Sequence, residues 1–201
     1  MVDREERLKS LLSFDAGFNI KPLAGIDEAG RGPLAGPVTA ACVIMPEDSR
    51  LLYVDDSKSV SEKRREQVYE EIMQTAVFVQ TASIPPEIID KINILNATRL
   101  AMAEAAKNCP AELFLVDYVD NLELPKKSLS LTKGDSRSYS IAAASIVAKV
   151  TRDRLMREAD KAYSGYSFSK NKGYGTKEHI QAIKTLGPCP IHRRSFITKF
   201  L

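Results

Sequence analysis

Two adjacent carboxylates, Asp27 and Glu28, stand at the end of an apolar run and just before the glycine-rich turn Gly30-Arg31-Gly32. Neighbouring carboxylates repel, and each raises the pKa of the other unless a cation lies between them. Mg²⁺ and Mn²⁺ prefer oxygen ligands of this kind. The pair therefore predicts a divalent metal site, although ordinary turns also carry acids, and the pair alone leaves that alternative open.

Two further acids stand where a sheet would present them at one edge. Asp117 ends the apolar run 113–116, and Asp135 follows Lys133-Gly134 at the start of a long helical segment. With the first pair they make four carboxylates, enough to hold two divalent ions about 4 Å apart. One ion would activate water, and the other would stabilise a leaving 3′ oxygen at phosphorus. The set therefore predicts metal-dependent hydrolysis of a phosphodiester.

Hydrolysis of this kind requires no general-base histidine. The two histidines, His179 and His192, each stand alone in a basic segment, and we expect them to contact phosphate or to lie on the surface. Asp153 could be mistaken for a fifth metal ligand. Because Arg152 and Arg154 flank it, a structural ion pair is the better expectation.

Asp27 and Glu28 pose a geometric problem, because neighbouring residues of a regular strand point to opposite faces. Both can serve one site only if the strand breaks there. The following Ala29-Gly30 supplies a plausible break, and Glu28 has the longer side chain. Direct metal binding by Glu28 stays open at this point.

The glycine-rich turn fits neither of two familiar nucleotide motifs. A P-loop needs Lys and then Ser or Thr after its glycine, whereas Arg31-Gly32 follows Gly30. A dinucleotide fingerprint needs a helix next, but Pro37 leads into the β-branched run 38–44. Without side chains at 30 and 32, the backbone can approach a ligand closely. A sugar or a phosphate suits such a turn.

The apolar pattern predicts the elements that must position these residues. Strands are expected at 23–27, 38–45, 77–84, 113–116 and 128–132, and helices at 1–13, 92–107, 138–163 and from a Thr176 cap to Leu186. Another helix would begin at a Ser59 or Ser61 cap, and a loop would occupy 14–22. Three strands followed by alternating helix and strand predict an α/β fold with one mixed sheet and helices on both faces.

Length and composition favour one soluble domain over 1–201, with an N-terminal helical appendage at 1–20. The 201 residues are 44% hydrophobic and 27% charged. No run approaches the roughly 18 apolar residues of a membrane span, and the start MVDREERLKS is too charged for a signal peptide. We therefore expect a cytoplasmic protein. Its three cysteines form no CxxC pair and are expected to be reduced bystanders.

Charge is distributed unevenly along the chain, whose net charge is +3. Residues 161–201 hold eight Lys or Arg and one acid, Glu178, so the rest of the chain is net acidic. A basic end can bind phosphates, and an acidic body can hold divalent metals. This suits a metallonuclease with a basic substrate-binding segment at 164–201. A solvated basic surface would explain the same asymmetry equally well.

Seven motifs in this order resemble the bacterial ribonuclease HII family, the type 2 ribonucleases H: DEAGRG (27–32), DSK (56–58), LVD (115–117), KGD (133–135), AAASIVAKVTRDR (142–154), NKGYGTKEH (171–179) and PIHRRSF (190–196). The resemblance runs from about residue 23 to the end. It implies a ribonuclease H-like fold, with a five-stranded mixed sheet flanked by helices on both faces. It also implies a site of Asp27, Glu28, Asp117 and Asp135 that holds two Mn²⁺ or Mg²⁺ ions during catalysis. One departure is Tyr118, where members of the family often have glycine.

The resemblance also implies how substrate is read. The backbone of Gly30, Arg31 and Gly32 would read the ribose 2′-hydroxyl, and Tyr174 would stack on the sugar of the next, DNA-like nucleotide. The 2′-hydroxyl is what distinguishes RNA from DNA locally, and a glycine-flanked tyrosine is more easily explained as exposed than as buried. Phosphates would be held by basic side chains, namely Arg31, Lys58, Lys172, Lys177, Arg193 and Arg194.

The implied enzyme is an endonuclease that hydrolyses the phosphodiester 5′ of a ribonucleotide, in RNA/DNA hybrids and at single ribonucleotides embedded in duplex DNA. It would leave 3′-hydroxyl and 5′-phosphate ends and remove misincorporated ribonucleotides. A monomer is the default expectation for its oligomeric state. One alternative is ribonuclease HIII, against which Arg31 and the lack of a large N-terminal extension argue. Two others are a silent module that binds RNA/DNA hybrids and a resolvase-like nuclease, which would have no evident use for the GRG and KGYG elements.

Overall fold

The computed structural model describes residues 3–55 and 60–201. Its strands are β1 (Leu23–Ala29), β2 (Val38–Ile44), β3 (Phe78–Ile84), β4 (Leu113–Asp117) and β5 (Lys127–Leu131). Its helices are α1 (Arg4–Ala16), α2 (Glu62–Thr75), α3 (Pro86–Ala106), α4 (Tyr139–Ala162), α5 (Phe168–Asn171), α6 (Lys177–Leu186) and α7 (Arg194–Ile197), with short 3-10 helices η1 (Gly134–Ser136) and η2 (Thr198–Phe200). The DSK motif with Lys58, and the expected Ser59 cap, lie outside the described residues.

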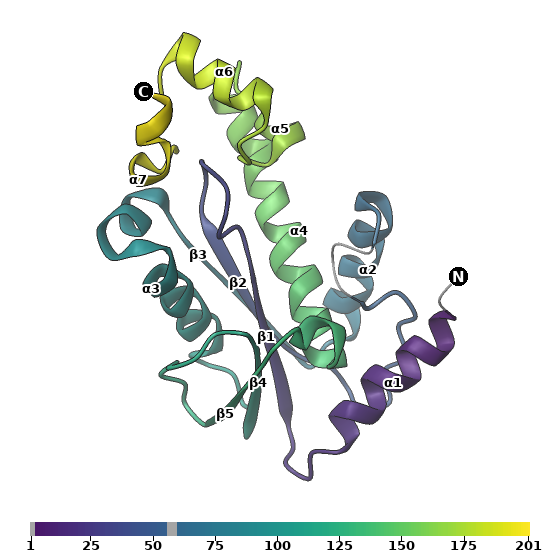
Figure 1. Ribbon diagram of the computed structural model, residues 1–201. Helices are drawn as coiled ribbons and strands as arrows, with labels where there is room; N and C mark the ends of the chain where they lie inside the picture. The colour runs from purple at the N-terminus through teal and green to yellow at the C-terminus, as the bar shows by residue number, and fades with distance from the viewer. Residues whose placement is uncertain (1–2, 56–59) are drawn as a thin grey trace.

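The five strands form one mixed sheet in the order β3-β2-β1-β4-β5. β2 pairs antiparallel with both β1 and β3, whereas β4 pairs parallel with both β1 and β5. Helix α4 covers one face together with α1 and α2, and α3 covers the other (Figure 1). The expected α/β fold, with helices on both faces of a five-stranded sheet, is therefore confirmed.

Helix α4 is the longest helix and crosses the middle of the sheet (Figure 1). Ser138 caps its start, where the side chain accepts from the N–H of Ile141. Gly25 of β1 lets the helix come close, because a Cβ at that position would lie 2.1 Å from the backbone of Ser140. Any larger residue at 25 would push the helix away. This close approach brings side chains of α4 within reach of the end of β1.

Two other predicted helix starts are confirmed. The side chain of Ser61 accepts from the N–H of Arg64 at the start of α2, and that of Thr176 accepts from the N–H of His179 at the start of α6. Each cap satisfies an N–H group that has no partner within its own helix.

Among the helices of residues 3–55 and 60–201, none has both the length and the apolar character that a membrane span requires.

Helix α1 continues to Ala16, beyond the expected end at residue 13. Leu8 and Leu11 are buried in the main core. Asp15, placed in a loop by the sequence pattern, is helical and buried, and its carboxylate accepts from the N–H and hydroxyl of Ser140 at 2.8 Å each. Contacts with α4 therefore extend this helix, and periodicity alone could not reveal them.

Helix α3 begins at Pro86, six residues before the expected start. Proline suits the first turn of a helix, because its missing N–H would have no partner there. Asn93 interrupts the helix with a φ of 65°, and its side chain accepts from the N–H of Asn96. The sequence pattern identified the segment after this kink and missed the part before it.

Candidate metal centre

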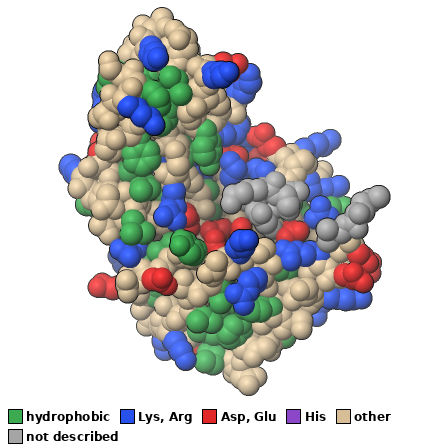
Figure 2. Space-filling view, viewed as in Figure 1, with side chains coloured by type: hydrophobic (Ala, Val, Ile, Leu, Met, Phe, Trp, Pro, Cys, Tyr) green, Lys and Arg blue, Asp and Glu red, His purple; other side chains and the backbone are tan. Residues whose placement is uncertain are grey.

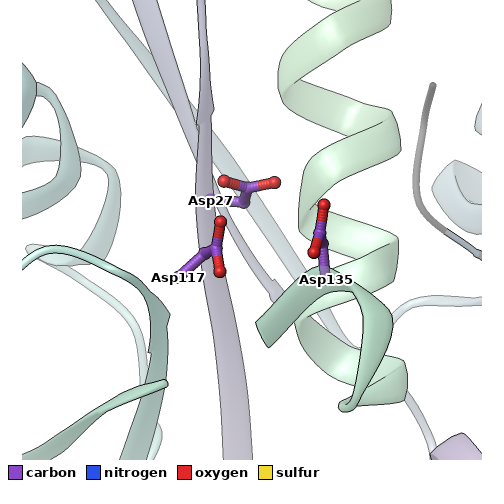
Figure 3. A group of neighbouring side chains, drawn as sticks. All are labelled: Asp27, Asp117 and Asp135. Carbon is purple, nitrogen blue, oxygen red and sulfur yellow. The ribbon is translucent and has the colours of Figure 1, made fainter. Parts of the chain in front are cut away.

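Asp27 and Asp117 lie side by side at the carboxyl ends of two parallel strands. β1 and β4 pair with Ile26 opposite Val116, so the acids that follow these residues share one level of the sheet. Asp135 comes from η1, just before α4. One carboxylate oxygen of each of these three acids lies within 4.8 Å of the other two, and Figure 3 shows the three side chains pointing toward one another. The structure therefore brings together three of the four expected acids.

Hydrogen bonds hold these carboxylates in place. Oδ1 of Asp117 accepts from the N–H of Gly134 at 2.6 Å, and Oδ1 of Asp27 accepts from the N–H of Glu28 at 2.7 Å. Ser145 of α4 also hydrogen-bonds to the Asp27 carboxylate. Ser145 had no predicted role, although it is the only polar residue in the run 141–148.

Glu28 does not reach the site through a broken strand, as the sequence analysis required. β1 runs unbroken to its end, with Glu28 opposite Ala40 and Ala29 opposite Thr39 in the ladder with β2. Glu28 borders the same cleft but is not one of the three clustered acids. Its Oε1 lies 3.6 Å from Nη1 of Arg31, and its buried Oε2 has no hydrogen-bond partner among the described residues.

The electrostatics of these acids fit a divalent cation. Burial raises the pKa of Asp27 well above its usual value, and the charges of Glu28 and Asp117 raise it further. Burial also raises the pKa of Glu28, with Arg31 acting in the opposite direction. Buried carboxylates that repel one another are stabilised by a positive ion between them, and an all-oxygen donor set suits Mg²⁺ or Mn²⁺.

Three of the four expected acids, Glu28, Asp117 and Asp135, line a cleft of about 570 Å³. Its lining residues are Glu28, Arg31, Asp117, Tyr118, Thr132, Lys133, Asp135 and Ser136. Figure 2 shows acidic side chains in the middle of this face with Lys and Arg side chains around them. A second cavity of about 560 Å³ lies at the opposite end of β1 and holds none of the four acids. The arrangement that can do phosphodiester chemistry is therefore the acidic cleft.

Arg193 is not available to phosphate, and the prediction that it binds phosphate is wrong. Its side chain is completely buried. It donates to the carbonyls of Gly30 at 2.6 Å, Arg31 at 2.8 Å and Gly36 at 3.0 Å. A side chain without exposed surface cannot contact substrate, so Arg193 holds the glycine-rich loop instead.

The other expected substrate-binding side chains occupy different environments. Tyr174 is 45% exposed and lies beside Gly32, since a Cβ at Gly32 would be 3.9 Å from the tyrosine ring. Lys177 and Arg194 are exposed. The ammonium of Lys172 lies 3.3 Å from a carboxylate oxygen of Glu62, and the lysine side chain is only 12% exposed. Arg31 also lies near a carboxylate, that of Glu28, but its side chain is 38% exposed.

Both histidines are buried, contrary to the expectation that they lie on the surface or contact phosphate. His179 is 0% exposed and His192 is 1% exposed, and their Nε2 atoms lie 3.0 Å apart. They pack against the rings of Tyr166 and Phe168. Neither can serve as a general base. Their burial follows from contacts between α6, which carries His179, and the segment before α7, which carries His192, and the sequence pattern did not reveal these contacts.

Asp153 forms a structural ion pair, as expected. Its carboxylate lies 2.6 Å from Nζ of Lys149 and 3.6 Å from Nη1 of Arg65. The flanking arginines, which suggested the ion pair, point elsewhere: Arg154 binds glutamates of α2, and Arg152 donates to backbone carbonyls.

Comparisons with known proteins point to one family. The family model for ribonuclease HII matches residues 24–199. A ribonuclease HII of Caldanaerobacter subterraneus subsp. tengcongensis is 51% identical over 190 residues, which cover 94% of this chain and 78% of that protein. A ribonuclease HII of Ruminiclostridium cellulolyticum is 49% identical over 207 aligned residues, which cover 99% of this chain and 80% of that protein. The fold is similar to that of RNase HII in a PCNA:RNase HII complex from Archaeoglobus fulgidus, with a TM-score of 0.77, 26% identity, and coverage of 89% of this chain and 96% of that one.

Proposed function

This chain belongs to the ribonuclease HII family, and we propose that it hydrolyses the phosphodiester on the 5′ side of a ribonucleotide. As a member of that family it is a type 2 ribonuclease H, a hydrolase. The proposed substrates are RNA/DNA hybrids and DNA duplexes with single embedded ribonucleotides. The proposed products carry 3′-hydroxyl and 5′-phosphate ends, and the proposed role is removal of misincorporated ribonucleotides by a monomer in the cytoplasm.

The cluster of Asp27, Asp117 and Asp135 carries this proposal. Three carboxylate oxygens within 4.8 Å of one another, one of them on a buried acid whose pKa is raised, need positive charge to remain ionised. When bound there, a pair of Mg²⁺ or Mn²⁺ ions would supply the activated water and the stabilised leaving oxygen of an in-line displacement at phosphorus.

The residues of the chain have separate parts in this proposal. The three aspartates are the proposed metal ligands. Glu28, at the border of the cleft, is proposed as a fourth metal ligand, because its Oε2 is buried and has no hydrogen-bond partner among the described residues. Ser145 and Gly134 orient Asp27 and Asp117 through their hydrogen bonds.

Substrate recognition is proposed to rest on the Gly30–Gly32 loop and on Tyr174. The exposed tyrosine ring lies beside Gly32, so one face of the protein offers both a close backbone and an aromatic platform. A base or sugar next to the ribonucleotide can stack on such a ring. Arg31, Lys172, Lys177 and Arg194 are the proposed phosphate contacts among the described residues, and Lys58, which lies outside them, is a further proposed contact.

The proposal is tested with three labelled substrates: a DNA duplex with one ribonucleotide, an RNA/DNA hybrid, and an all-DNA branched duplex. Each is incubated with Mg²⁺, with Mn²⁺ and with EDTA. We expect a metal-dependent nick 5′ of the single ribonucleotide, cleavage of the hybrid, and no cleavage of DNA alone. Cleavage of the hybrid without cleavage at the single ribonucleotide would favour a ribonuclease HIII-like activity. Binding without cleavage in either metal would favour a silent hybrid-binding module, and cutting of branched DNA would favour a resolvase.

A further inference from the structure

Two buried arginines donate to the backbone of the glycine-rich loop. The three donors of Arg193 reach the carbonyls of Gly30, Arg31 and Gly36. Each of the three guanidinium nitrogens therefore donates to a carbonyl of the loop. Arginine can make such planar, multidentate contacts, whereas lysine cannot. Arg193 therefore fixes the direction in which these carbonyls point.

Arg152 of α4 extends the same arrangement. It is 1% exposed and donates to the carbonyls of Pro37 at 2.9 Å, Lys172 at 2.9 Å and Ala35 at 3.1 Å. Its guanidinium carbon also lies 5.9 Å from the ring centroid of Tyr174. Arg152 therefore connects the loop 30–37 with the segment that carries the exposed tyrosine.

All six hydrogen-bond partners of these arginines are uncharged carbonyls. Burial lowers the pKa of Arg193 to about 9, and the charge of Arg152 acts in the same direction, so Arg193 still carries its proton at neutral pH. Two positive charges therefore lie beneath the loop. In a buried setting such charges are poorly screened, and their field favours an approaching phosphodiester.

The direction of the carbonyls determines where the N–H groups of the loop point. In a trans peptide unit the C=O and the following N–H point in opposite directions. Since the carbonyls of Gly30 and Arg31 point inward to Arg193, the N–H groups of Arg31 and Gly32 point away from the core. Gly32 has open space on its Cβ side out to 3.9 Å, where Tyr174 begins.

Gly30 and Gly32 lack a side chain in different surroundings. Gly30 has a φ of +101°, and a Cβ there would lie 2.0 Å from Nε of Arg152. The missing side chain at 30 therefore makes room for the arginine and not for a ligand, contrary to the sequence analysis. Gly32 faces open space and remains the position at which a ligand can approach the backbone.

We propose that Arg152 and Arg193 are positioning residues for ribonucleotide recognition, which hold the carbonyls of the loop inward so that the N–H groups of Arg31 and Gly32 donate to the ribose 2′-oxygen. This rests on the proposed function, in which the same loop reads the sugar. The two arginines act through the loop and do not touch substrate. They also set Tyr174 at a fixed place relative to Gly32, through the contact of Arg152 with the carbonyl of Lys172.

The test compares Arg152→Lys and Arg193→Lys with wild type in binding to two DNA duplexes that differ only in one 2′-hydroxyl. EDTA is present so that no strand is cut. Wild type is expected to prefer the duplex with the ribonucleotide, and each variant is expected to lose that preference by roughly fivefold to tenfold. Lysine keeps the charge but cannot satisfy three carbonyls in a plane. The matched control is Arg157→Lys, on the same helix, whose side chain binds Glu62 and Glu66 instead of the loop.

Retained preference for the ribonucleotide in both variants, with an unchanged Mn²⁺-dependent rise in melting temperature to show an intact fold, would overturn the proposal. Equal loss in Arg157→Lys would also overturn it. A second measurement uses wild type alone: the amide resonances of Arg31 and Gly32 should shift on addition of the ribonucleotide duplex but not of the all-DNA duplex, and their failure to respond contradicts the proposal even if the variants do not fold. Absence of any preference in wild type would instead count against the proposed function itself.

Discussion

The backbone N–H of Gly134 donates a hydrogen bond of 2.6 Å to Oδ1 of Asp117, and this bond joins the two segments that carry the second and third acids. Asp135 is the next residue after Gly134, so the bond also fixes the start of the turn from which Asp135 enters the cleft.

Gly134→Ala is expected to weaken the metal site. An added Cβ would lie 2.6 Å from Cδ1 of Ile141 and 3.2 Å from Oδ1 of Asp117. Either these side chains must move, which displaces the Asp117 carboxylate, or the turn must shift and carry Asp135 with it. Groups that orient metal ligands typically affect affinity or activity by about 10–100-fold, and we expect a loss in that range in Mn²⁺ titration calorimetry and in cleavage rate. Gly17→Ala, at the end of α1, is the control. Unchanged Mn²⁺ affinity in Gly134→Ala would show that this bond does not position the acids.

Asp27→Asn is expected to stabilise the protein without metal while removing its activity. The raised pKa of Asp27 means that its ionised form is disfavoured in the folded state. Folding stability is therefore lost as the pH rises above the pKa of aspartate in the unfolded chain, which is near 4. At pH 7.5 in EDTA the variant should melt about 2–4 °C higher than wild type, the shift that roughly 1 kcal/mol gives in a chain of this size.

Mn²⁺ should raise the melting temperature of wild type and raise that of Asp27→Asn much less, because ligand binding to the folded state stabilises it. Glu123→Gln, which removes an exposed acid outside the cleft, should respond to Mn²⁺ as wild type does. An Asp27→Asn protein that melts lower than wild type in EDTA, or that gains as much from Mn²⁺, contradicts this account.

The buried histidine pair is expected to make stability depend on pH. Nδ1 of His179 lies 2.9 Å from the carbonyl oxygen of Tyr174, which can only accept, so Nδ1 carries the proton. Nε2 of His179 then accepts from Nε2–H of His192, and Nδ1 of His192 accepts from the N–H of Cys189 at 3.0 Å. Both rings are therefore neutral in this arrangement.

Burial lowers the pKa of His192 to about 4 and also lowers that of His179. Unfolded histidines bind protons near pH 6.5, so the unfolded chain binds more protons between about pH 6.5 and 4, and stability falls as pH is lowered through that window. Urea unfolding at pH 7.5 and pH 5 should show that wild type loses about 1–2 kcal/mol more than His192→Gln. The contribution of the carboxylates to the pH dependence of stability is the same in both proteins and cancels in this comparison. Parallel pH dependence in the two would refute the neutral pair.

Asp153→Asn is expected to reduce stability and to leave the cleavage rate per folded molecule unchanged. Asp153 is 4% exposed and pairs with Lys149 and Arg65, so its loss leaves positive charges partly buried without their partner. Breaking such a pair costs roughly 2–4 kcal/mol, which urea unfolding measures directly. A drop in rate for protein that is fully folded would mean that Asp153 takes part in the chemistry after all.

Asp27 and Asp117 were predictable because each ends an apolar run whose length and composition identify a strand, and Asp135 was predictable from its place at the start of a long helical segment. Asp117 ends such a run, and parallel pairing with β1 brings it beside Asp27. The position of Glu28 was not predictable in the same way, because whether the strand continues past Asp27 depends on its ladder with β2, a contact between residues far apart in sequence.

Burial of charged residues near the C-terminus also could not be predicted from the sequence. Arg193 and Arg194 are adjacent and identical in type, yet the first is fully buried and the second is exposed. The environment of Arg193 is set by the loop 30–37, whose carbonyls accept from its side chain, whereas the N–H of Arg194 donates to Asp90. Composition indicates a basic segment but cannot separate a residue that contacts substrate from one that supports the loop.

The most direct test of the proposed reaction is the rate at which a labelled DNA duplex with one ribonucleotide is nicked in Mn²⁺, in wild type and in Asp27→Asn, Asp117→Asn, Asp135→Asn and Asp153→Asn. We predict a single nick 5′ of the ribonucleotide that disappears in EDTA, a loss of about 100-fold or more in each of the first three variants, and a rate close to wild type in Asp153→Asn. Cleavage in EDTA, or wild-type rates in any of the three clustered acid variants, would contradict the proposal that these carboxylates hold the catalytic metal ions.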